Sequence, residues 1–94
     1  MRIDIQHPHL DISATINEQV KTKVSKLEHF YENILDVIVY LREENSHKEI
    51  EMKVNVKDQT LFVKESGETF IAAIDVAMDV MKKQLIKYKE KHLQ

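Results

Sequence analysis

The sequence predicts an α+β fold, a two-layer sandwich with the element order β-α-β-β-β-α, in which both helices cover one face of a four-stranded sheet. Residues 49–57 alternate between apolar and polar side chains, which is typical of a strand with one face on the core and one in water. Apolar residues recur at spacings of three and four within 16–34 and 70–88, as in helices that bury one face. A chain of 94 residues supports one core, so residues 1–94 are expected to form a single domain.

The N-terminal half should supply the first strand, the first helix and the second strand. Residues 2–7 alternate, and Pro8 lacks the backbone donor that a continuing strand would need. Ser13 is the expected N-cap of a helix that runs to about Glu32. The apolar run 37–41 then predicts a central strand that is covered at least partly on both faces.

The C-terminal half should add a hairpin and a long helix. A polar loop at 44–47 leads into the strand at 49–57, and a short connection at 58–59 should join this strand to an antiparallel partner at 60–63. Thr69 is the expected N-cap of the final helix, which runs to residue 92. A strand-helix-strand crossover is right-handed in most folds, which places the first helix on one sheet face. We expect the first and fourth strands at the sheet edges.

Positive charge is concentrated near the C-terminus, although the whole chain carries a net charge of −2. Residues 82–92 contain five lysines against Glu90, a net charge of +4, whereas residues 36–51 carry five acids against two basic residues, a net charge of −3. On the final helix several of these lysines lie opposite the apolar face, so we expect one face to pack on the sheet and the other to contact a polyanion. The alternative is an ordinary solvated helix face. With two lysines of the first helix, the candidate residues are Lys23, Lys26, Lys82, Lys83, Lys87, Lys89 and Lys91.

Other classes of function find little support in the sequence. The chain has no cysteine, and its only paired histidines, His7 and His9, flank Pro8 without a third ligand, so we expect no metal site. With one glycine it lacks the usual phosphate-binding loop, and it shows no nucleophile-base pattern, so we expect neither an enzyme nor a cofactor nor a small-molecule substrate. No apolar run is long enough to span a membrane, and we expect a cytoplasmic protein without a membrane partner.

Two segments carry a family resemblance. The segment IAAIDVAMDVMKKQLIKYKEK resembles the second helix of the ribosome hibernation-promoting factor and ribosome-associated inhibitor family, of the sigma-54 modulation protein or S30EA type, whose pattern is AAID, apolar turns, a basic residue, QL and KxKxK. The segment KVSKLEHFYENI is similar to the KxxKLE and aromatic pair of the family's first helix. The resemblance extends over the whole chain.

The resemblance implies binding to rRNA of the small ribosomal subunit, in the channel used by messenger and transfer RNA, during stationary phase or stress. Occupancy of this channel would silence translation without chemistry. Val80 stands where many members carry lysine, and Lys83 stands where arginine is frequent. The chain resembles the short form, which lacks the C-terminal dimerisation domain of long members. The basic positions that match the family are Lys23, Lys26, Lys83, Lys87, Lys89 and Lys91.

Two alternatives remain open from the sequence. One is a protein-protein module that uses the bare sheet or its edge strands for β-augmentation. The other is a general double-stranded-RNA binder, since a sheet backed by two helices, as in double-stranded-RNA-binding domains, suits that role. An RNA complex should weaken steeply as salt rises, and a sheet-edge complex should respond less. Whether the chain promotes ribosome dimers or only blocks translation is also open.

Overall fold

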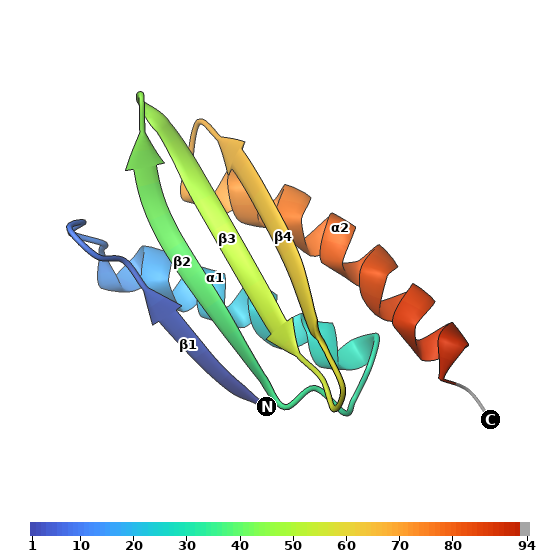
Figure 1. The fold of residues 1–94 in the computed structure, drawn as a ribbon. Helices are drawn as coiled ribbons and strands as arrows, with labels where there is room; N and C mark the ends of the chain where they lie inside the picture. The colour runs from blue at the N-terminus through green and yellow to red at the C-terminus, as the bar shows by residue number, and fades with distance from the viewer. Residues whose placement is uncertain (93–94) are drawn as a thin grey trace.

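The structure is a computed structural model and describes residues 1–92. Its elements follow the predicted order (Figure 1). They are β1 (Arg2–Gln6), α1 (Ala14–Ser25) with the short 3-10 helix η1 (Lys26–His29), β2 (Asp36–Glu44), β3 (His47–Asn55), β4 (Thr60–Gly67) and α2 (Phe70–Lys91). Within the described range, neither α1 nor α2 is long and apolar enough to cross a membrane.

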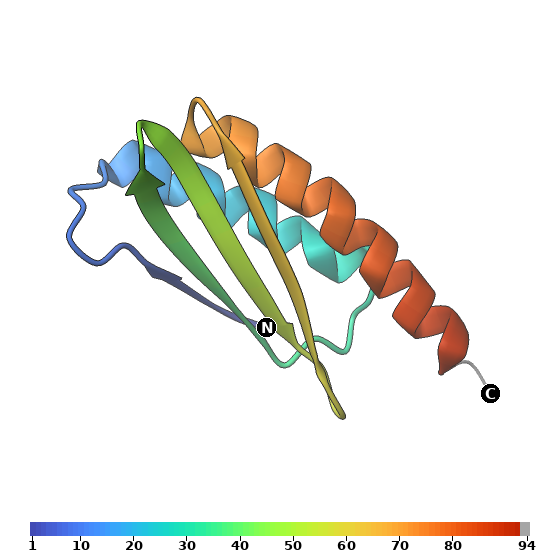
Figure 2. The ribbon, with the colours of Figure 1, turned by 45° about the horizontal axis from the view of Figure 1, so that its top comes forward.

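The four strands form one mixed sheet in the order β1-β2-β3-β4. β1 runs parallel to β2, and the other two pairs are antiparallel. A parallel pair needs a crossover connection, which α1 supplies. α1 and α2 lie side by side on one face of the sheet, and the other face is uncovered (Figures 1 and 2). The predicted two-layer α+β sandwich is therefore confirmed, with β1 and β4 at the edges as expected.

The core lies between the sheet and the two helices. Val37 of β2 pairs with Ile3 on one side and with Val54 on the other, so the apolar faces of neighbouring strands are in register. α2 buries Ile74, Met81 and Leu85 on this face, as their spacing predicts. The fully buried side chains of the other elements include Val20, Val24, Leu27, Val39, Leu41, Ile50 and Met52.

The central strand β2 is buried on its helix-facing side, and neighbouring side chains partly shield its other side. Tyr40 points to the uncovered face and is half-buried. The Arg42 guanidinium carbon lies 4.9 Å from the centroid of the Tyr40 ring, and Lys53 Nζ lies 5.6 Å from the same centroid. The stems of these long cationic side chains shield the ring, and this explains why the apolar run of β2 is continuous although no helix packs on this face.

The first helix ends earlier than its apolar spacing predicts. α1 stops at Ser25 and η1 at His29, whereas the expected end was about Glu32. Ser25 Oγ donates a hydrogen bond to the carbonyl oxygen of Thr22 at 2.6 Å, a local bond that competes with regular helix geometry. Beyond the helix, the Tyr31 ring packs edge-on against the Tyr88 ring with centroids 5.4 Å apart, so this contact with α2 replaces a further turn.

The strands of the hairpins differ from the predicted bounds. The predicted polar loop at 44–47 is a two-residue turn, because Asn45 and Ser46 adopt positive φ angles of 50° and 67°, which suit a tight hairpin. β3 therefore begins at residue 47 instead of 49, and it ends at 55. β4 continues to Gly67 instead of ending at 63, because its polar second half pairs with β3.

Candidate nucleic-acid interface

The long helix α2 is capped at its start and tied to the sheet at its middle. Thr69 caps it, since its Oγ1 accepts a hydrogen bond from the Ala72 N–H at 3.0 Å. Gln84 Nε2 donates to the backbone oxygen of Phe62 at 2.9 Å, which ties the helix to the edge strand β4. With its apolar side buried, α2 must present its lysines to solvent along the remaining surface.

The structure divides six of the seven candidate lysines between two flanks of α2. On the flank that faces α1 and η1, Lys82 Nζ lies 5.1 Å from the Phe30 ring centroid, and Lys89 borders a hollow formed with residues 28–33. On the flank that faces β4, two lysines border a hollow beside Leu61. We name the first group the inter-helix lysines, Lys23, Lys26, Lys82 and Lys89. We name the second group the edge lysines, Lys87 and Lys91.

Two candidate lysines form ion pairs with α2 carboxylates. Lys23 Nζ lies 2.8 Å from Asp75 Oδ1, a contact that joins α1 to α2. Lys83 Nζ, on the outer side of α2 between the two flanks, lies 3.6 Å from Asp79 Oδ2 one turn away. Exposed pairs of this kind contribute only about 0–1 kcal/mol, so both lysines can exchange their carboxylate for a phosphate at little cost.

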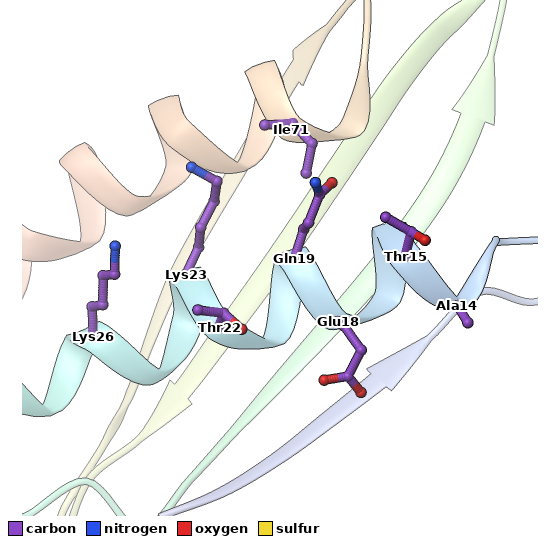
Figure 3. A pocket seen from close by; sticks show the side chains of 8 residues that line it. All are labelled: Ala14, Thr15, Glu18, Gln19, Thr22, Lys23, Lys26 and Ile71. Atoms are coloured by element: carbon purple, nitrogen blue, oxygen red, sulfur yellow. The ribbon is translucent and has the colours of Figure 1, made fainter.

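A groove of about 770 Å³ lies between α1 and the first turn of α2 (Figure 3). Side chains from Ala14 to Lys26 form its α1 side, and Ile71 lines it from α2. Lys23 and Lys26 stand at one end of it. The groove therefore opens onto the same side of the molecule as the inter-helix lysines Lys23 and Lys26.

The C-terminal end of α2 is tied to the turn between β3 and β4. Tyr88 Oη donates a hydrogen bond to Asp58 Oδ1 at 2.5 Å, and His92 Nε2 lies 3.2 Å from Asp58 Oδ2. The His92 ring stacks on the Tyr88 ring with centroids 4.1 Å apart, and its Nδ1 lies 2.8 Å from the Tyr88 carbonyl oxygen. We call these three residues the C-terminal clamp. It fixes the last turns of α2, which carry the edge lysines.

The charge state of the clamp follows from its donors and acceptors. A carbonyl oxygen and an ionised carboxylate can only accept hydrogen bonds, so a nitrogen of His92 is the donor in each of the two contacts that it makes. The hydrogen bond from Tyr88 lowers the pKa of Asp58, and the positive charge of His92 lowers it further. The same hydrogen bond to the Asp58 carboxylate raises the pKa of Tyr88 to about 12.

Comparison with known proteins identifies the family. Residues 3–93 match the model of the family described as Sigma 54 modulation protein / S30EA ribosomal protein. The chain belongs to this family. A ribosome hibernation promoting factor from Azotobacter vinelandii is 31% identical over 94 residues, which cover 100% of this chain and 88% of that protein. The resemblance seen in the sequence is thereby confirmed.

Solved structures of similar fold agree with the architecture. A ribosomal subunit interface protein from Coxiella burnetii superposes with a TM-score of 0.89 at 20% identity, over 96% of this chain and 99% of that one. The N-terminal domain of Protein Y from Thermus thermophilus gives a TM-score of 0.83 at 25% identity, over 94% and 99% of the two chains. At 20% identity, the likeness to the Coxiella burnetii protein concerns the fold alone.

Several features of this surface have no signal in the sequence. Asp58 contacts Tyr88, which is 30 residues away in the sequence, and His92, which is 34 residues away, so no local motif predicts the clamp. The division into two flanks depends on where α1 and β4 lie beside α2. Val80 is half-buried against the core on the β4 flank.

Proposed function

We propose that this protein is a ribosome-associated hibernation factor that binds rRNA of the small ribosomal subunit in the channel used by messenger and transfer RNA. The observation that carries the proposal is the gathering of seven lysines on the helical layer of a chain whose net charge is −2. Family membership supports the ribosome as the partner. The protein would act in the cytoplasm, where ribosomes work.

The chemistry of the surface favours a polyanion that is held by shape and charge. Lysine is a point charge on a flexible stem, so it contacts phosphate without reading base edges. Inter-helix and edge lysines lie on opposite flanks of α2, and a ligand that touches both must wrap around the helix. Folded rRNA, which surrounds a channel on several sides, offers such a surface, whereas one straight duplex contacts one side.

The uncovered face of the sheet is less suited to a polyanion. Two of its cationic side chains are paired with acids across neighbouring strands, Arg42 with Glu51 and Lys64 with Glu49. These pairs neutralise one another and leave no strong field of either sign. The helical layer is therefore the side that we assign to RNA.

The mechanism that follows is steric. A domain seated in the channel excludes both messenger and transfer RNA, and translation stops without any bond being made or broken. Competition on purified small subunits tests this. Subunits loaded with a short messenger and transfer RNA should bind the protein far more weakly than empty subunits, and bound protein should block loading. Equal binding to loaded and empty subunits would contradict occupancy of the channel.

A further inference from the structure

The groove between α1 and α2 has a neutral, hydrogen-bonding middle. Thr15, Gln19 and Thr22 line it at spacings of four and three along α1, and all three are exposed. Figure 3 shows Gln19 directed across the groove toward Ile71. At about 1.5 Å per residue this row is about 10 Å long, which corresponds to about three nucleotide steps at about 3.4 Å each.

The charged side chains that line the groove lie beside the row of Thr15, Gln19 and Thr22. Lys23 and Lys26 stand at the C-terminal end of the row, and Figure 3 shows both reaching toward α2. Glu18 also borders the groove, but its carboxylate points away from α2 toward β1 (Figure 3). The half-buried side chain of Ile71 adds an apolar wall. The groove thus combines an end with two lysines, of which Lys23 is paired with Asp75 and Lys26 is exposed, an apolar wall and a row of uncharged donors and acceptors.

RNA presents three matching groups along its backbone. Its phosphates are anionic, its sugars have apolar C–H faces, and its 2′-hydroxyls both donate and accept hydrogen bonds. A threonine hydroxyl and a glutamine amide also both donate and accept. DNA offers the phosphates and sugars but not the 2′-hydroxyls, so only the neutral row can distinguish the two polymers.

We infer that this groove recognises the ribose of RNA. Thr15, Gln19 and Thr22 hydrogen-bond 2′-hydroxyls, Ile71 packs on the sugar, and the two lysines hold flanking phosphates. This inference rests on the proposed function and deepens it, because it assigns the selectivity for RNA to uncharged side chains of α1 and only the electrostatic affinity to lysine. The lysines alone would bind any polyanion.

The test is a triple variant that keeps size and charge. Thr15→Val, Gln19→Met and Thr22→Val remove the hydrogen-bonding groups, and Gln19→Met alone serves as a milder second variant. The matched control is Gln6→Met with Ser66→Ala on the uncovered sheet face. Affinity for purified small subunits is measured across salt concentrations, together with a 2′-hydroxyl acylation footprint of the rRNA and the urea unfolding curve of each variant.

We expect the triple variant to bind about tenfold more weakly, as for the loss of a few hydrogen bonds, with an unchanged salt slope because no phosphate contact is lost. It should also lose acylation protection at a subset of the nucleotides that wild type protects, and Gln19→Met should lose part of it. The control should match wild type. Full protection by folded variants would overturn the inference and leave the proposed function standing, whereas a wild type that fails to bind subunits would overturn both.

Discussion

The two lysine flanks predict a distinctive salt dependence of binding. If all seven candidate lysines contact phosphates, the logarithm of the association constant falls with the logarithm of salt concentration with a slope of about −6, at about 0.9 per contact. Between 50 and 200 mM salt this corresponds to a loss of affinity of about five-thousandfold. Neutralising two contacts should reduce the magnitude of the slope by about 1.8.

Two double variants test the flanks separately. One is Lys82→Gln with Lys89→Gln between the helices, and the other is Lys87→Gln with Lys91→Gln beside β4. Each should weaken binding of the labelled protein to small subunits, as measured by fluorescence anisotropy. Each should also reduce the magnitude of the salt slope to a similar extent.

The control for these variants lies on the opposite side of the molecule. Lys53→Gln with Lys64→Gln removes two charges from the uncovered sheet face and should leave the slope unchanged. If only one flank alters the slope, the ligand does not wrap around α2. If the sheet-face control alters it as much as the helix variants do, assignment of RNA to the helical layer is refuted.

Four further changes probe the fold and the surface. Ser46→Gly should stabilise the protein by up to about 1 kcal/mol in urea unfolding, because φ at this position is 67° and relief of the left-handed backbone, about 1–2 kcal/mol, outweighs the extra freedom that glycine gives the unfolded chain, about 0.5–1 kcal/mol. Met81→Ala, which empties a fully buried site, should cost about 2–5 kcal/mol in the same assay. Val80→Lys should strengthen subunit binding and steepen its salt slope by about 0.9, at some cost in stability because this side chain is half-buried. The wild type should lose stability as pH rises from about 10, the ordinary tyrosine pKa, to about 12, the raised pKa of Tyr88, because Tyr88 ionises in this range. Tyr88→Phe should abolish this pH dependence of the free energy of unfolding.

The acid side of the pH profile follows from Asp58. Because the folded state lowers the pKa of this carboxyl, its contribution to stability is present above its ordinary pKa of about 3.9 and is lost as pH falls through the lowered value. Asp58→Asn should therefore reduce the acid sensitivity of unfolding, as measured by urea titrations below pH 5. An unchanged acid profile in this variant would show that the clamp does not form in solution.

Periodicity was enough to predict the layers of the fold. The alternation that begins at residue 49 and the helical spacing around Ile74 each define one buried face, and two helices with one sheet can bury such faces together only as a sandwich. Element ends were less predictable. Ser25 and Tyr31 shorten the first helix through a local hydrogen bond and a distant ring contact, neither of which alters the apolar spacing.

The polar half of β4 shows a second limit of sequence patterns. Residues 64–66 are too polar to indicate a strand, and they extend because β3 already offers paired backbone groups beside them. The candidate site likewise depends on contacts that local sequence patterns do not contain. Five of its seven lysines could be named from their clustering in residues 82–91, but the two flanks and the clamp depend on contacts between elements that are distant in sequence.

Binding to isolated small subunits is the most direct test of the account. Wild type, Lys83→Glu with Lys87→Glu on α2, and Lys53→Glu with Lys64→Glu on the uncovered sheet face should be co-sedimented with purified subunits at low salt. We predict that wild type and the sheet-face variant pellet with the subunits and that the α2 variant stays in the supernatant. Loss of binding by the sheet-face variant with retention by the α2 variant would contradict the account and place the ribosome contact on the sheet.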